Sequence, residues 1–150
     1  MRSFITKCTI TSLAGFLLLV GVIVGLFLNR SLIGIGWPAL AVQGLAVILM
    51  LWARLVFGRR SFHATAPPIE GGLVTTGPYR FLRHPIYAAV LYFLWAGVLS
   101  HLSVKTVVLG LVAIGAVALR ISPEECLLAL RYPAYAVSAA RTKRVLPFLF

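Results

Sequence analysis

The sequence has few charged residues, and acidic residues are almost absent. Asp and Glu together number 3 in 150 residues, and charged residues of all kinds make up 11%, against about a quarter in a typical soluble domain. Hydrophobic residues make up 61%, and the mean hydropathy is +1.00. This composition excludes an ordinary water-soluble domain. About four membrane spans of roughly 20 residues each would occupy nearly the whole sequence.

Cysteine is also scarce. Cys8 and Cys126 lie far apart in the sequence, and neither has a partner at metal-ligand spacing. They therefore predict no disulfide framework and no metal site. The 14 Lys and Arg residues would suggest nucleic acid in a soluble protein. Here they flank apolar runs, where topology and anionic headgroups account for them, so we expect no nucleic-acid partner.

Long apolar runs predict an all-α polytopic membrane protein with a single domain, residues 1–150. The expected transmembrane helices cover residues 10–28, 37–57, 85–102 and 105–121. The first run is too long for a signal-peptide core and has no small-residue cleavage site. The fourth run is short, because the stretch between Lys105 and Arg120 would extend only about 21 Å. It crosses the bilayer only if those two side chains snorkel or lie at membrane depth.

Two local patterns predict how the remaining residues are organised. Gly and Pro pairs interrupt residues 61–84 and predict one long loop, after which Pro85 suits the first turn of a helix, with His84 at or beside its N-cap. The tetrapeptide Ser122-Pro123-Glu124-Glu125 has the pattern of a capping box. It predicts a break after the fourth span and a separate C-terminal helix, residues 123–140, along the membrane surface.

Basic residues are divided unevenly between the two sides. With four spans, Arg30 and Lys105 fall on one side and the other twelve Lys and Arg residues on the other. The positive-inside rule then predicts that both termini, the long loop and the C-terminal helix are cytoplasmic. We interpret the basic residues near the C-terminus, including Lys143 and Arg144, as orientation signals. That side also holds all the acidic residues and two histidines: Glu70, Glu124, Glu125, His63 and His84.

Two clusters on that side are candidates for chemistry. Residues 77–87 place aromatic, basic and imidazole groups just before a helix N-terminus, which favours anion binding. Alternatively, they form an interfacial belt whose arginines contact lipid phosphates. In the second cluster, Arg120 lies near the end of a span, where an ionisable residue indicates function. The alternative gives Arg120 a snorkelling role and Glu125 the cap, which leaves Glu124 available for a site.

Three elements, in order, resemble the isoprenylcysteine carboxyl methyltransferase family and the related phospholipid methyltransferases. The elements are residues 73–79, the Arg-His-Pro-x-Tyr motif at 83–87, and Arg120 with Glu124-Glu125, followed by Leu128, Tyr132, Tyr135 and Pro147. The resemblance extends over about residues 52–147. The chain departs from the family at Ala89 and Pro133, where glycine is common, and at Ala64, where animal enzymes have glutamine.

The resemblance implies a methyltransferase that binds S-adenosylmethionine between the long loop and the C-terminal helix. The cofactor-binding positions that it implies are Leu73, Val74, Tyr79, His84, Pro85, Ile86, Tyr87 and Glu124. Arg120 matches a substrate-binding arginine, and Arg120 and Glu124 are the expected catalytic residues. The implied partners are membrane lipids and a lipophilic or lipid-anchored substrate that enters sideways from the bilayer.

The acceptor determines what these residues must do. A carboxylate of the isoprenylcysteine type, which we expect first, is ionised at pH 7, and the planar fork of Arg120 can hold it. A phospholipid amine or a small thiol would need deprotonation by His84, Glu124 or Tyr87. Two alternatives are a non-catalytic protein of the same fold, which would bind no cofactor, and a transporter. A transporter predicts an ionisable residue inside an early span, and no such residue is present there.

Overall fold

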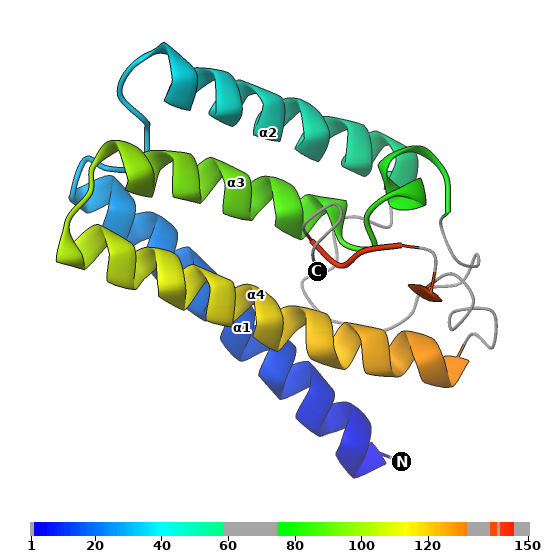
Figure 1. Ribbon diagram of the computed structural model, residues 1–150. Coiled ribbons are helices and arrows are strands. Elements are labelled where there is room, and N and C mark those ends of the chain that lie inside the picture. The colour runs from blue at the N-terminus through cyan, green and yellow to red at the C-terminus, as the bar shows by residue number, and fades with distance from the viewer. Residues whose placement is uncertain (1, 59–74, 132–138, 141, 146–150) are drawn as a thin grey trace.

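The computed structural model describes residues 2–58, 75–131, 139–140 and 142–145. The described residues form four α-helices and one short 3-10 helix: α1 (Arg2–Leu28), α2 (Trp37–Phe57), η2 (Gly77–Arg80), α3 (Pro85–Ser100) and α4 (Val104–Arg131). Consecutive α-helices run in opposite directions (Figure 1). The start of α1, the end of α2, the start of α3 and the end of α4 therefore share one end of the bundle, which we call the loop end. This confirms the predicted all-α polytopic fold.

Three of the described helices have the length and apolar composition to cross a membrane: Thr6–Leu28, Trp37–Phe57 and Val104–Leu130. The short apolar helix is α3, with 16 residues, or about 24 Å. The sequence had predicted that the fourth span would be the short one, and that was wrong. Leu94 and Val98 of α3 are almost completely buried, so neighbouring helices rather than lipid cover much of this helix (Figure 1).

Helix α4 continues through Ser122-Pro123, where the sequence predicted a break. Glu125 does not cap a new helix, because its carboxylate accepts hydrogen bonds from Arg83 and Arg144 instead. Pro123 provides no N–H for the turn before it, but transmembrane helices tolerate such a proline where neighbouring groups compensate. The prediction of a separate helix starting at residue 123 is therefore wrong over residues 123–131. Residues 132–138 lie outside the described residues.

The capping box is instead at the true start of α4. The Ser103 hydroxyl accepts a hydrogen bond from the Thr106 backbone N–H at 3.2 Å, and the Thr106 hydroxyl accepts one from the Ser103 N–H at 3.0 Å. This reciprocal pair satisfies two donors that a helix start otherwise leaves without partners. From this start, α4 runs for 28 residues and ends at Arg131, beyond Arg120.

Helix α1 begins at Arg2, earlier than the predicted span at residue 10. Its buried positions alternate in steps of four and three residues: Cys8, Ser12, Gly15, Leu19, Val22 and Leu26. That spacing gives a helix one continuous contact face, and this face lies along α4 (Figure 1). Cys8 forms a small buried cluster with Leu127 near the end of α4. Helix α1 therefore packs along α4 as far as the loop end.

Polar and small residues hold α2 and α3 together at the opposite end. Gln43, buried in α2, accepts a hydrogen bond from the Gly34 N–H and donates to the carbonyls of Leu32 and Phe93. A Cβ added at Gly97 would lie 2.5 Å from the Ser31 carbonyl oxygen, so only glycine lets α3 approach the connection between α1 and α2. Gln43 therefore links α2 to α3 and to the connection between α1 and α2.

Candidate active site

Three side chains from α3 and α4 form a polar cluster at the loop end. The Tyr87 hydroxyl donates to Glu124 Oε1 at 2.5 Å and accepts from Arg120 Nε at 2.9 Å. Arg120 Nη2 lies 3.7 Å from the same carboxylate oxygen. Because Arg120 and Glu124 are four residues apart on one helix, they project from the same face. Tyr87, in the first turn of α3, meets both of them and completes the cluster.

His84 connects this cluster to a second one. The ring is buried at the N-cap of α3, with Nδ1 3.9 Å from Glu124 Oε2 and Nε2 3.3 Å from Glu125 Oε1. Glu125 also accepts from Arg83 Nη1 at 2.9 Å and from Arg144 Nε at 3.0 Å. The imidazole is thus held between two carboxylates, and the second carboxylate is also paired with two arginines.

Residues 142–145, which we call the strap, lie beside the segment that leads into α3. Leu82 and Lys143 form a parallel bridge, and the backbone N–H groups of Arg83 and His84 donate to the carbonyls of Lys143 and Arg144. The Tyr92 hydroxyl donates to the Val145 carbonyl. The interpretation of Lys143 and Arg144 as orientation signals stays a prediction, but both residues also contact the start of α3 or Glu125, which the sequence did not predict.

Three of the other predicted cofactor residues lie in the part of the chain that the structure describes: Tyr79, Pro85 and Ile86. Tyr79 lies buried on η2, with its ring centroid 5.5 Å from that of Phe57. Burial, followed by the negative charge of Glu124, raises the pKa of the Tyr79 phenol, so the hydroxyl remains a neutral donor. Pro85 and Ile86 form the first turn of α3. Leu73 and Val74 lie outside the described residues, as does Ala64.

Helix α1 contributes contacts that the sequence did not predict. The Arg120 guanidinium carbon lies 5.4 Å from the centroid of the Phe16 ring, and Nη1 lies 3.4 Å from the Ser12 carbonyl oxygen. Only 5% of Arg120 is exposed. Exposed and buried positions of α1 are both mainly apolar, so the sequence pattern does not show which face of α1 contacts α4. Nothing in the apolar run around Phe16 indicates a neighbouring arginine.

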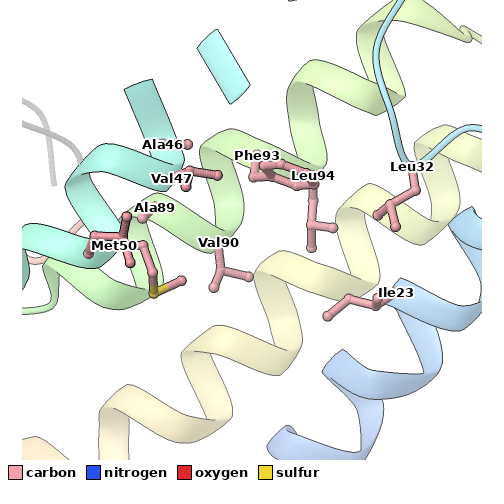
Figure 2. Close-up of a pocket in the computed structure, with 10 residues that line it drawn as sticks. Ile23, Leu32, Ala46, Val47, Met50, Ala89, Val90, Phe93 and Leu94 are labelled. Atoms are coloured by element: carbon pink, nitrogen blue, oxygen red, sulfur yellow. The ribbon is translucent and has the colours of Figure 1, made fainter. Parts of the chain in front are cut away.

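An apolar pocket of about 210 Å³ lies between α1, α2 and α3 (Figure 2). Its lining residues are Ile23, Leu32, Ala46, Val47, Met50, Leu51, Ala89, Val90, Phe93 and Leu94. Val90 is three residues after Tyr87, so the pocket begins about one helical turn from the polar cluster. Engineered apolar cavities of about 150 Å³ hold benzene. This pocket therefore has room for a segment of hydrocarbon.

A family model described as phospholipid methyltransferase matches residues 31–134. No curated protein and no solved structure matches the chain significantly. The matched range covers α2, η2, α3 and α4, and with them Tyr87, Arg120 and Glu124. Together with the apolar helices, the match identifies a membrane protein that transfers methyl groups from S-adenosylmethionine. The chain belongs to the phospholipid methyltransferase family of integral membrane methyltransferases.

Proposed function

We propose that this enzyme methylates the amine of a membrane phospholipid at the cluster of Tyr87, Arg120 and Glu124. The observation that carries the proposal is the set of contacts around Arg120. Its Nε, Nη1 and Nη2 face Tyr87, the Ser12 carbonyl and Glu124. A carboxylate acceptor held by the guanidinium fork would compete with these partners for the same nitrogens. An amine instead needs a carboxylate nearby, and Glu124 is that group.

In the proposed reaction, each residue of the cluster has a role in the transfer of a proton from the lipid ammonium. When bound, S-adenosylmethionine supplies a methyl group whose leaving group is a neutral thioether. Glu124 accepts a proton from the lipid ammonium, which frees the nitrogen lone pair to form the N–C bond as the S–C bond breaks. Tyr87 holds the carboxylate in place by its hydrogen bond, and Arg120 balances its charge. The product is a methylated ammonium. Fixed positions alone can accelerate such a displacement greatly.

The chemistry of the surrounding residues supports a cofactor site at the loop end. S-adenosylmethionine carries an ammonium, a carboxylate and a sulfonium. Cations bind favourably over aromatic faces, and the Tyr79 ring on η2 is the aromatic group that we propose for the sulfonium. The first turn of α3, at Pro85 and Ile86, suits the methionine carboxylate. We therefore propose Tyr79, His84, Pro85, Ile86, Tyr87 and Glu124 as the cofactor-binding residues among those described, and we extend the proposal to Leu73 and Val74.

The apolar pocket supports a lipid rather than a soluble acceptor. It begins about one turn beyond Tyr87 and lies between helices that cross the bilayer. A lipid with its headgroup amine at Glu124 would direct an acyl chain toward Val90 and Phe93. Ala89, at a position where the family commonly has glycine, is one of the lining residues. Its methyl group is expected to narrow the space available to that chain.

We also propose that the loop end faces the cytoplasm. The described basic residues at that end include Arg54, Arg80, Arg83 and Arg144, whereas Arg30 and Lys105 lie at the other end. Basic residues close to membrane spans favour the cytoplasmic side. The methyl donor would then reach the site directly from the cytoplasm.

Cofactor binding is tested with the product analogue S-adenosylhomocysteine. A ligand that binds only the folded state at 100 times its Kd stabilises that state by about 2.7 kcal/mol. We expect the Tm of the purified protein in detergent to rise by about 5 to 11 °C. An equal concentration of methionine is the control ligand and should leave the Tm unchanged. If millimolar ligand gives no shift while the protein is demonstrably folded, the proposed cofactor site is wrong.

The acceptor is tested with radiolabelled methyl donor and vesicles of defined composition. Vesicles with phosphatidylethanolamine should yield labelled lipid, whereas vesicles with phosphatidylcholine alone should not, because a quaternary nitrogen has no lone pair. A prenylated cysteine carboxylate and a small thiol are offered in parallel reactions. Labelling of the prenylcysteine alone, as a base-labile ester, would overturn the amine proposal and restore the carboxylate as acceptor.

A further inference from the structure

We infer that α1 is part of the reaction site and that Phe16 is a positioning residue for Arg120. The inference rests on the proposed role of Arg120. Its guanidinium carbon lies 5.4 Å from the Phe16 ring centroid and 5.5 Å from the Tyr87 ring centroid. A planar guanidinium stacks favourably on aromatic faces. Phe16 and Tyr87 thus lie beside the guanidinium from α1 and from α3.

The backbone of α1 comes unusually close to Arg120. A Cβ added at Gly15 would lie 2.7 Å from the Ala116 carbonyl oxygen and 2.9 Å from Arg120 Cγ. Any larger residue at this position would push α1 away from α4. The same approach brings the Ser12 carbonyl to 3.4 Å from Arg120 Nη1. Helix α1 therefore contacts both the aliphatic stem and the charged head of this side chain.

These contacts lie outside the region that the family similarity covers. The family match begins at residue 31 and leaves out α1 entirely, so the match gives α1 no function. A helix that served only as an anchor would need apolar surface and no particular residue near Arg120. Phe16 is 38% exposed, so its ring contributes little to the core. A role in holding the guanidinium accounts for its position.

The variant Phe16→Leu tests this inference, because it keeps an apolar side chain of similar reach and removes the aromatic face. We expect kcat for methyl transfer to fall by about 3- to 30-fold, the range that a cation–π contact supports. The KM for S-adenosylmethionine and the Tm should change little. Phe16→Tyr keeps the ring and should restore kcat to within about twofold. Phe27→Leu, at a position 66% exposed on the same helix, is the matched control.

Two results would contradict the proposed role of Phe16. A wild-type kcat for Phe16→Leu would overturn it, as would an equal loss in Phe16→Leu and Phe16→Tyr, since the ring would then have no special role. If Phe16→Leu lowers the Tm by several degrees, Phe16→Met, which also lacks the ring, replaces it under the same criteria. Arg120→Lys separates the two proposals. If it is fully active, the proposed site fails, and if it is impaired while Phe16→Leu is not, only the role of α1 fails.

Discussion

Replacing Arg120 by alanine is expected to lower kcat for methyl transfer by about 10²- to 10³-fold, as removal of a single charge-stabilising donor does in other active sites. Arg120 Nη2 lies 3.7 Å from Glu124 Oε1, and Arg120 Nε donates to the Tyr87 hydroxyl. Without this side chain, the carboxylate loses its arginine partner, while His84 remains 3.9 Å away, and Tyr87 loses a donor. Binding of S-adenosylhomocysteine should remain largely intact, because the proposed cofactor contacts lie mainly before and within α3.

The measurement compares turnover with the Tm shift that S-adenosylhomocysteine produces in the same preparation. Lys105→Ala is the control, since Lys105 is an exposed cation near the other end of the same helix. Arg120→Lys keeps the charge but provides no planar fork, and it should recover only part of the activity. A parallel loss of turnover and of ligand binding in Arg120→Ala would mean that Arg120 is a structural residue or a cofactor ligand.

The second large effect is expected for Glu124→Gln. The amide has nearly the same shape and can still accept the Tyr87 hydrogen bond, but it takes no proton from an ammonium. General bases contribute about 10²- to 10⁴-fold to rate, and we expect kcat for a phospholipid amine to fall within that range. A carboxylate acceptor carries no proton at neutral pH. The same variant should therefore spare much of the activity if the acceptor is a carboxylate.

Glu125→Gln is the comparison variant for Glu124→Gln. Glu125 pairs with Arg83 and Arg144, and these contacts join the strap to the start of α3. Glu125→Gln should weaken these pairs and show its main effect as a lower Tm. If Glu124→Gln retains full activity toward a phospholipid amine in the vesicle assay, Glu124 is not the proton acceptor.

Local sequence signals predicted the helix bounds correctly where a proline begins the helix or an arginine lies near its end. Trp37-Pro38 at one end and Arg54 at the other gave the bounds of α2 correctly, and Pro85 gave the start of α3 with His84 at the N-cap. In both cases proline occupies the first turn, where its missing N–H costs nothing. These signals act within a few residues, so they can be read without knowledge of the fold.

The break predicted at Ser122-Pro123 failed because the deciding contacts are distant in sequence. Glu125 is 42 residues from Arg83 and 19 from Arg144, and those arginines draw its carboxylate away from the cap. The cluster around Arg120 was only partly foreseen for the same reason. Its polar members can be recognised by residue type, but Phe16 belongs to a uniformly apolar helix. Only the packing of α1 along α4 brings its ring to the guanidinium.

That packing of α1 along α4 has a consequence for the order of assembly. Transmembrane helices enter the bilayer as they are synthesised, and α1 precedes its partner by two whole helices and a long loop. Until α4 arrives, the face around Ser12 and Gly15 has only lipid or a passing helix beside it. Contacts between such distant segments form late, because loop closure must come first. Phe16 and Arg120 can therefore meet only after α4 has been inserted, and we expect methyl transfer to depend on that late contact.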